Sequence, residues 1–470
     1  MAGNFKVLIA GGSLVGLTLA ISLEHAGIDY ELFEKGDFAP QLGASIGFYP
    51  QSNQLMDQLG VWSEIEKVVI PLRARYHFDE NGYCMEASIA LQYLQQYLKY
   101  PTIFMERSEM LRILHDRIAD PMKLHSQSPV VAYEETPGGI AVTTADGQRF
   151  QGSILVGADG IHSRVRQLMA DKIHPTDVAL AEGIEQSFTS EYKCLFAVSR
   201  NDPAAPFLPD GTVHNVYHQN HSALAATGVP GLVFWFLFVK VPNMWTPNCP
   251  RFTEADADAL AHEYGHVAPG PGYTIRDLWT ARVKGSLVSL EEGIVSQWSH
   301  GRVLLLGDAA HKVTPNAGFG GNLALEGVAH LTNALVALLQ DCGPRTAPEV
   351  EQLGALFAEF DRSHRPRATA VLGLSAKITR YEAQETGFLR FAARYLSPVI
   401  PDRWKAALFA RFASGAPRLE FLPIKTAAAA VATACVGRSV REQDKGTGKV
   451  WLGVGLVGVV AAVGLATSRR

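Results

Sequence analysis

The sequence predicts an α/β protein, because three glycine-rich segments far apart in the chain each follow a short apolar run. The segments are Gly11–Gly16, Gly157–Gly160 and Gly307–His311. An apolar run, a glycine turn and then apolar residues at helical spacing are the pattern of a strand, a tight turn and a helix. The chain has 470 residues, 47% hydrophobic and 19% charged, which is ample for two intergrown domains with large cores.

The first segment predicts a dinucleotide-binding turn. Lys6–Ala10 reads as an apolar strand, and Leu17–Ala26 repeats apolar residues at helical spacing. The small residues between them would let backbone N–H groups approach a pyrophosphate at the positive end of the helix. These residues are Gly11, Gly12, Ser13 and Gly16. Ser13 replaces the second glycine of the usual fingerprint, and a glycine turn in some other α/β protein is the alternative.

Glu34 ends the second predicted strand, Tyr30–Glu34, and lies 18 residues after Gly16. A carboxylate at this position can accept hydrogen bonds from both hydroxyls of an adenosine ribose. The same carboxylate would repel a 2′-phosphate. This end of the chain therefore predicts FAD or NAD, rather than NADP, as the resident cofactor.

The third segment favours FAD. Arg302–Leu306 reads as an apolar strand that runs into Asp308, and a glycine cluster precedes a helix predicted over Leu323–Leu339. A carboxylate after a strand can bind a ribityl hydroxyl of FAD. Gly320 and Gly321, at the helix N-terminus, can face the electron-rich pyrimidine side of a flavin. NAD has no ribityl chain.

These three segments resemble the GxGxxG, DG and GD motifs of the single-component FAD-dependent monooxygenases, the group A aromatic hydroxylases and their squalene-epoxidase relatives. The resemblance covers roughly residues 5–400. It implies a Rossmann-like FAD-binding domain interleaved with a β-sheet substrate domain and followed by C-terminal helices. Two further FAD-contact segments match at Gly43–Gly47 and Glu106–Leu111. They imply that Gly47 approaches FAD and that Arg107 contacts its ribityl–pyrophosphate portion, whereas a solvated helix cation is the alternative for Arg107.

The resemblance also implies the reaction. In such enzymes NADPH reduces FAD, O₂ adds at the flavin C4a atom, and the hydroperoxide delivers one oxygen to an electron-rich carbon. The sequence has no second dinucleotide fingerprint, which fits transient NADPH binding without a separate domain. Asp159, with Arg164 and Arg166 behind it, is the candidate link between FAD binding and NADPH use. A plain turn after Ile154–Val156 is the alternative.

A narrower resemblance is to fungal monooxygenases of meroterpenoid and indole-diterpene pathways, which epoxidise prenyl chains. It rests on Gly11–Ser13, on Phe48–Pro50 and on an apolar C-terminal tail. Tyr217 lies where these relatives place an active-site tyrosine, so it is the candidate catalytic residue, and an ordinary strand tyrosine is the alternative. The implied substrate is a hydrophobic prenylated or terpenoid molecule. Phenol hydroxylation, or a membrane-anchored flavoprotein reductase or carrier without oxygenation, are the alternative functions.

The predicted domains follow the order of the motifs. They are residues 1–170 (FAD-binding, with a β excursion near 73–97), 171–290 (substrate sheet), 291–345 (rest of the FAD-binding domain), 346–425 (helical) and 426–470 (apolar tail). Strands are predicted at 193–198, 213–218 and 232–239. The last of these is apolar on both faces, so it is either a plain core strand or also a wall of an isoprenoid pocket.

The apolar tail predicts a membrane anchor. Residues 450–467 form an 18-residue run without a charge, with lysines before it and arginines after it. As a helix this run would span roughly 27 Å, which suits the hydrocarbon core of an endoplasmic reticulum membrane. We therefore expect a C-terminal anchor in that membrane with the catalytic domain facing the cytosol. A buried or docking helix is the alternative.

The net charge and the cysteines of the sequence indicate which other classes of partner are not expected. The formal net charge of −4 gives no basic footprint, so nucleic acid is not a predicted partner. The five cysteines are scattered, and no Cys or His cluster in the sequence has the spacing of a metal site. No metal is therefore predicted.

Overall fold

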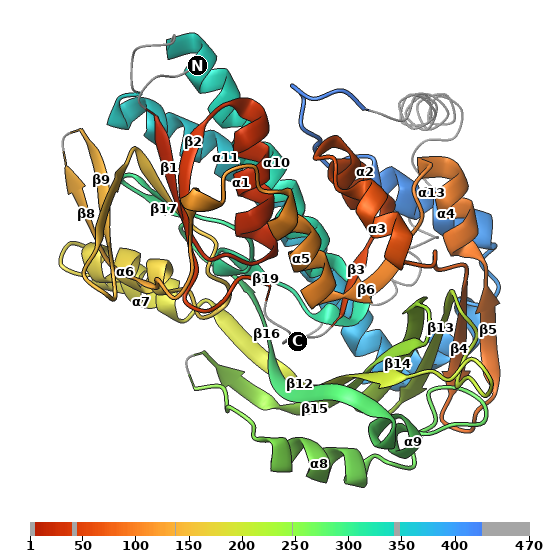
Figure 1. Ribbon diagram of the computed structural model, residues 1–470. Coiled ribbons are helices and arrows are strands. Elements are labelled where there is room, and N and C mark those ends of the chain that lie inside the picture. The colour runs from red at the N-terminus through yellow and green to blue at the C-terminus, as the bar shows by residue number, and fades with distance from the viewer. Residues whose placement is uncertain (1–4, 40–44, 137, 247, 343–347, 425–470) are drawn as a thin grey trace, which may run out of the picture.

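A computed structural model of the chain describes residues 5–39, 45–136, 138–246, 248–342 and 348–424. The predicted anchor at 450–467 and the first two residues of the Gly43–Gly47 segment lie outside these ranges. Within them, the chain forms two halves that meet along a cavity (Figure 1).

The first half is built on a six-stranded sheet of the order β17-β18-β11-β1-β2-β7. All of its neighbours pair in parallel except β17 and β18. The strands are β1 (Lys6–Ala10), β2 (Asp29–Phe33), β7 (Leu124–His125), β11 (Ile154–Gly157), β17 (Ser299–His300) and β18 (Val303–Leu305). This sheet brings the first, second and third glycine-rich segments to neighbouring strand ends.

Helices and a small sheet flank these strands (Figure 1). Beside the sheet, α1 packs against α5 and α10, and the antiparallel β8-β9-β10 sheet lies on the other side. The helices are α1 (Leu14–Ala26), α5 (Arg107–Arg117), α6 (Arg164–Ile173), α7 (Val178–Glu185) and α10 (Phe319–Cys342). The small sheet is β8 (Val130–Thr136), β9 (Gly139–Thr144) and β10 (Arg149–Gly152).

The second half is an eight-stranded sheet of the order β19-β16-β12-β15-β14-β13-β4-β5. Its strands are β4 (Ala74–Asp79), β5 (Cys84–Ser88), β12 (Phe188–Arg200), β13 (Thr212–His218), β14 (His221–Val229), β15 (Leu232–Trp245), β16 (Arg282–Ile294) and β19 (His311–Lys312). A small pair, β3 (Ser45–Phe48) and β6 (Ile103–Glu106), lies between the halves. The segment near 73–97 thus contributes β4 and β5 to the same sheet as 171–290.

The large sheet has an apolar layer on each face. On β15, Trp235 and Leu237 belong to an outer core that α8 (Glu254–Glu263) and α9 (Ile275–Thr280) cover. Phe236 and Phe238 alternate with them and lie on the opposite face, which we call the inner face. The 232–239 strand is therefore apolar and covered on both faces, and its role as a wall of an isoprenoid pocket stays a prediction.

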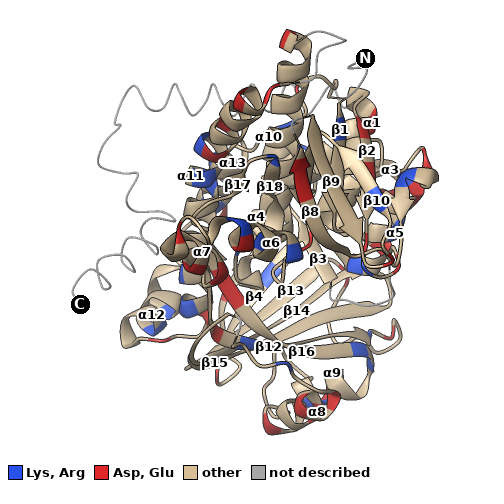
Figure 2. Cartoon of the chain, turned by 90° about the vertical axis from the view of Figure 1, so that its left-hand side faces the viewer, with Lys and Arg blue, Asp and Glu red and all other residues tan. Residues whose placement is uncertain are grey.

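The remaining helices pack around the junction of the two halves. They are α2 (Pro50–Gln58), α3 (Trp62–Val68), α4 (Ala90–Leu98), α11 (Val350–Glu382), α12 (Gly387–Phe391) and α13 (Asp402–Ala413), with a π-helical segment at Ala392–Leu396. Figure 2 shows acidic and basic residues interspersed over the outer helices, while the strands of the large sheet are mostly uncharged. By length and composition α10 could cross a membrane, but most of it is buried inside the protein.

Three sequence predictions need correction. The helix predicted from Leu323 begins at Phe319, so Gly320 and Gly321 lie in its first turn. The predicted helix at Leu17 begins at Leu14, directly after Ser13. The 171–290 range also holds α8 and α9, which cover the outer face of the sheet, and α7, which packs against α6 in the first half.

Candidate functional site

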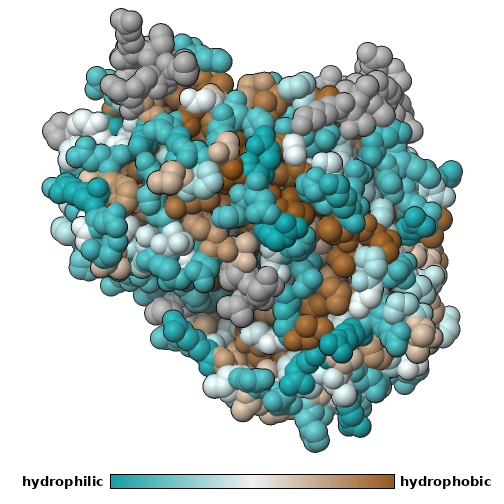
Figure 3. All heavy atoms as spheres, in the orientation of Figure 1, coloured by the Kyte–Doolittle hydropathy of each residue, from teal (hydrophilic) through white to brown (hydrophobic). Residues whose placement is uncertain are grey.

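A cavity of about 720 Å³ lies between the two halves. Residues of all three glycine-rich segments line one side of it, and the inner face of the large sheet lines the other. Figure 3 shows hydrophobic residues gathered in the hollowed middle of the molecule, where the two halves meet. The cavity thus joins the predicted cofactor residues to an apolar wall.

The first turn is closed tightly against the second glycine-rich segment. A Cβ atom on Gly11, whose φ is +108°, would lie 2.4 Å from the carbonyl oxygen of Ala158. Both Gly11 and Gly12 line the cavity, and so does Ser13 at the N-cap of α1. Ser13 makes no side-chain capping bond within the described chain, and the first turn of α1 carries no acid. The positive end of α1 is therefore available to an anion.

Glu34 is held against this turn. Its Oε2 atom accepts a hydrogen bond of 2.6 Å from the N–H of Gly12, and its Oε1 atom accepts one of 3.0 Å from Gly36. The carboxylate lines the cavity at the end of β2, where the sequence predicted a ribose contact. Backbone amides therefore fix the position of the charge.

Gly16 is the one predicted cofactor residue that does not line the cavity. A Cβ atom at this position would lie 1.9 Å from the carbonyl oxygen of Gly11. Gly16 thus lets α1 approach the turn closely, and its role toward a cofactor is indirect.

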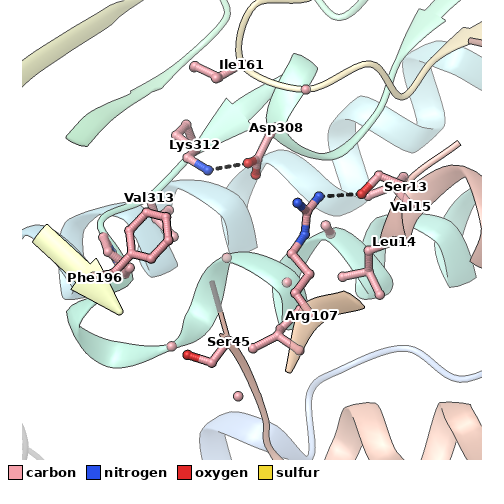
Figure 4. Close-up of a pocket in the computed structure, with 18 of the residues that line it drawn as sticks. Ser13, Leu14, Val15, Ser45, Arg107, Ile161, Phe196, Asp308, Lys312 and Val313 are labelled. Atoms are coloured by element: carbon pink, nitrogen blue, oxygen red, sulfur yellow. Dashed lines mark hydrogen bonds and ion pairs between the residues drawn. The ribbon is translucent and has the colours of Figure 1, made fainter. Parts of the chain in front are cut away.

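Arg107 is the central cation of the site (Figure 4). It begins α5, directly after β6, and its guanidinium donates to Ser13 Oγ. Burial lowers the pKa of Arg107, while the nearby Asp308 and Glu34 carboxylates raise it. The predicted alternative of a solvated helix cation does not describe this side chain, which points into the cavity.

Asp308 follows β18 in a short 3₁₀ turn and lines the cavity. Its carboxylate is paired with Lys312, four residues later, which also lines the cavity (Figure 4). Sequence reasoning did not identify Lys312. The spacing of four residues from a predicted cofactor acid was the available signal, but it is too common to single out one lysine.

The second segment reaches the cavity through Asp159. This carboxylate accepts a hydrogen bond from Ser163 Oγ and one of 3.0 Å from the N–H of Val165, and burial raises its pKa. Arg166 is 3% exposed and donates to the carbonyl oxygens of Ile161 and Ala309. Neither Arg164 nor Arg166 lines the cavity. Of the three residues in the predicted NADPH link, Asp159 is the one that reaches it.

The first turn of α10 forms the far edge of the cofactor side. Gly320 and Gly321 both line the cavity. A Cβ atom on Gly320 would meet only Val313 within 4 Å, at an ordinary 3.7 Å, so packing does not require glycine there. Asn322 donates to the carbonyl oxygen of Gly47 at 3.0 Å and so fixes that glycine in the lining.

The inner face of the large sheet supplies an apolar wall. Its side chains come from β12, β14, β15 and β16, whose register places them on one face. Among the described residues that line the cavity here are Cys194, Phe196, Leu224, Phe236, Phe238 and Leu290. The polar side chains Arg75, Thr102 and Asn316 border this apolar part.

Tyr217 lies outside the cavity lining. Its register opposite Ser222 places it on the inner face of the sheet, but Tyr381 of α11 and Ala393 cover it. Its hydroxyl lies 2.6 Å from His77 Nδ1. Burial raises the pKa of the phenol well above its usual value and lowers that of His77, so a neutral phenol and a neutral imidazole share this hydrogen bond. Its predicted catalytic role therefore stays a prediction.

The residues present fit FAD. A helix N-terminus free of acids and the half-buried Arg107 suit a pyrophosphate, and the carboxylates of Glu34 and Asp308 flank them on two strand ends. The lack of a side chain at Gly320 leaves open space at the start of α10, whereas a Cβ atom on Gly321 would lie 2.9 Å from Ile46. No group of three or more His, Cys, Asp or Glu side chains that could hold a metal occurs in the described part of the chain.

Comparison with known proteins gives concordant results. A family model described as FAD binding domain matches residues 4–189 and 276–347. FAD-dependent monooxygenase olcE of Penicillium canescens is 34% identical, over 90% of this chain and 90% of its own. FAD-dependent monooxygenase ptmM of Penicillium ochrochloron is 35% identical, over 85% of this chain and 94% of its own.

Solved structures share the fold. HpxO of Klebsiella pneumoniae, complexed with FAD and uric acid, aligns with a TM-score of 0.71 at 20% identity. The alignment covers 89% of this chain and 98% of that one. 2-Methyl-3-hydroxypyridine-5-carboxylic acid oxygenase aligns with a TM-score of 0.62 at 18% identity, over 86% of this chain and 96% of its own.

Proposed function

The chain belongs to the FAD-dependent monooxygenases of fungal secondary metabolism, and from this premise we propose that it epoxidises the prenyl chain of a terpenoid intermediate. The observation that carries the proposal is the single cavity shared by the FAD-binding residues and an apolar wall. A wall rich in Phe and Leu suits an isoprenoid chain, which offers apolar area and electron-rich double bonds.

Each part of the cofactor would be held by a different segment. Gly11 to Ser13 and Arg107 would hold the pyrophosphate, Glu34 the adenosine ribose, and Asp308 the ribityl chain. The start of α10 would face the flavin ring. Bound FAD supplies the oxygen-activating chemistry, with NADPH as the reductant.

The protein's own contribution is orientation and exclusion of water. One atom of O₂ enters the substrate and the other leaves as water, while NADPH gives up two electrons. The apolar side chains of the wall, among them Cys194 and Leu290, keep the substrate side of the cavity dry, which suppresses wasteful loss of peroxide. The same wall would hold a double bond in one pose toward the flavin.

The test is oxygen transfer by the purified full chain. Flavin is first reduced anaerobically with NADPH, then mixed with O₂ and a farnesylated or geranylgeranylated phenol. We expect a product heavier by one oxygen atom, located on the prenyl chain by fragmentation. The same phenol without its prenyl group is the control. Oxygen found on the ring would support aromatic hydroxylation instead, and reduction without any oxygenated product would support a reductase or carrier.

We also propose that the C-terminal segment 450–467 anchors the enzyme in the endoplasmic reticulum membrane, with the catalytic domain facing the cytosol. Its 18 uncharged residues support this. Exposed aromatic side chains on the described surface agree with a nearby bilayer, because Phe388, Phe391 and Tyr395 recur at helical spacing and rings of this kind favour the membrane interface.

Membrane anchoring can be tested by sedimentation after alkaline extraction. The full chain should stay in the membrane pellet, whereas L456R/V459R should move to the supernatant with FAD still bound. Retention of the double variant in the pellet would contradict an anchor at 450–467. A wild-type chain that is extracted as readily as a soluble marker would contradict anchoring altogether.

A further inference from the structure

One cation interrupts the apolar wall. Arg75 lies on β4, and its cross-strand partner is Val213 on β13. Val213 in turn pairs with Ala226, and Ala226 pairs with Phe234 on β15. Because side chains alternate along each strand, this register places Arg75 on the inner face, where it lines the cavity.

Arg75 has no acid partner. Within the described part of the chain its guanidinium forms no hydrogen bond and no ion pair within 4 Å, and its Nε atom is shielded from solvent without a partner. Arg75 is half-buried, and a charge that is partly removed from water without a partner is costly, so proteins usually pair it. The missing partner is therefore expected to come from the occupant of the cavity.

One buried acid interacts with Arg75 electrostatically but does not form an ion pair with it. Glu382, the last residue of α11, is buried, and its Oε2 atom accepts a hydrogen bond of 2.8 Å from Asn316. Its Oε1 atom faces Asn215 at 3.5 Å. Burial raises the pKa of Glu382 to about 7, while Arg75 works in the opposite direction. Much of Glu382 is thus uncharged at neutral pH, and the positive charge of Arg75 remains.

A second unpartnered group borders the same cavity. Thr102 is 6% exposed and lines the cavity, and its Oγ1 atom has no hydrogen-bond partner among the described residues. Leu72, which also lines the cavity, links Thr102 to the start of β4 through a backbone hydrogen bond of 2.9 Å. Arg75 on β4 and Thr102, directly before β6, thus each present an unsatisfied donor at the edge of the apolar wall.

We propose that Arg75 binds an acidic oxygen of the substrate, a phenol or enol hydroxyl taken as its anion, at one end of a molecule that is otherwise apolar. The proposal rests on the monooxygenase function above and narrows its substrate class. Two N–H groups of the guanidinium can converge on such an oxygen, and Thr102 can donate a further hydrogen bond to it. An indole head is disfavoured, because its N–H is a donor and would leave Arg75 without a partner.

This anchor also orients the reaction. With the head held at Arg75, the prenyl chain lies along the phenylalanine wall toward the residues that would hold the flavin. The distance of each double bond from the head group then decides which one reaches the flavin. The double bond that is epoxidised therefore depends on the length of the prenyl chain and not on the intrinsic reactivity of its double bonds.

The test uses 2-farnesyl-4-nitrophenol and its methyl ether with the full-length holoenzyme. The nitrophenol reports its own ionisation by absorbance, so binding and charge are read together. Wild type should bind the phenol as its anion and lower its apparent pKa, and it should bind the ether about 10- to 100-fold more weakly. R75Q should lose that preference, whereas R75K should keep the charge and recover part of it.

Arg73→Gln is the matched control, because Arg73 is exposed and lies two residues away. R73Q should behave as wild type, and FAD content with thermal melting should show that all variants are folded. Equal binding of phenol and ether by wild type, equal preference in R75Q, or no binding of the phenol at all would overturn the proposal. Binding as the anion without oxygenation would contradict only the monooxygenase substrate proposed above, so the two failures are distinguishable.

Discussion

Asp308 connects the two ends of the candidate cofactor site. It follows β18, lies beside Arg107 and is paired with Lys312 (Figure 4). Asp308→Ala should lower FAD affinity by about 10- to 100-fold, because a charge-assisted hydrogen bond to the ribityl chain would be lost. Flavin absorbance per protein after gel filtration measures this. Asp116→Ala, on the exposed side of α5, is the control, and a D308A protein with full flavin content would remove Asp308 from the cofactor site.

Tyr217 illustrates how position limits a role. Tyr217→Phe removes the hydrogen bond between the buried Tyr217 hydroxyl and Nδ1 of His77, so we expect a loss of about 1–3 kcal/mol of stability with FAD still bound. The ratio of product formed to NADPH oxidised should stay close to that of wild type, because Tyr217 does not line the cavity. A folded Y217F enzyme that releases much more hydrogen peroxide would instead support the direct catalytic role predicted from the sequence.

Residues whose chemistry depends on local spacing could be predicted from the sequence. Gly11, Glu34 and Asp308 each follow a strand in a recognisable motif, and all three line the cavity. Arg75 and Lys312 could not be predicted in this way. Arg75 matters because the pairing of four strands places it on the same face of the sheet as Phe234, and this register is invisible before the sheet is assembled.

The packing of α1 against its preceding turn is the sharpest constraint at the scale of elements. Gly16→Ala would place a methyl group 1.9 Å from the carbonyl oxygen of Gly11. The helix must shift, so we expect a loss of about 1–3 kcal/mol of stability and weaker FAD retention. Thermal melting and flavin content measure both effects.

Gly373 provides the matched control within a helix. A Cβ atom on Gly373 of α11 would meet nothing within 4 Å. Gly373→Ala should therefore stabilise the protein slightly, by about 0.5–1 kcal/mol, because alanine has the better helix propensity. If G16A and G373A melted alike, the close approach of α1 to Gly11 would not be a structural requirement.

The strands that could be predicted from the sequence are those whose residues commonly occur in β-sheets. The predicted strands at 193–198, 213–218 and 232–239 lie within β12, β13 and β15. β14 was not predicted, because His221–Val229 is rich in alanine and has few β-branched residues. It forms a strand because β13 and β15 pair with it on both sides, so tertiary pairing outweighs its weak propensity.

At the scale of the whole molecule, the site arises because the chain crosses between the halves several times. β4 and β5 leave the first half and join the large sheet, and β16 leads back to β17. The cofactor side could be predicted because each motif is local. The substrate side could not, because it is assembled from strands separated by more than 200 residues, such as β4 and β16.

The pH dependence of stability tests that assembly, because Glu382 is buried where α11 meets β13. Its pKa is raised from 4.5 to about 7, so the folded state binds more protons than the unfolded state between these values. Glu382 therefore stabilises the fold fully below pH of about 4.5, and this stability is lost as pH rises through about 7. A pKa shift of this size corresponds to about 3 kcal/mol in the free energy of unfolding.

Glu382→Gln removes this titration while keeping an oxygen for Asn316. Urea unfolding of both holoenzymes between pH 5 and 8 should show wild type losing stability relative to E382Q as pH rises. Buried histidines such as His77 and His311, whose pKa values are lowered by burial, act in the opposite direction in both proteins and cancel in the difference. Parallel curves would mean that Glu382 is already ionised in the fold. It would then neutralise Arg75, and the cavity would have no need of an acidic substrate oxygen.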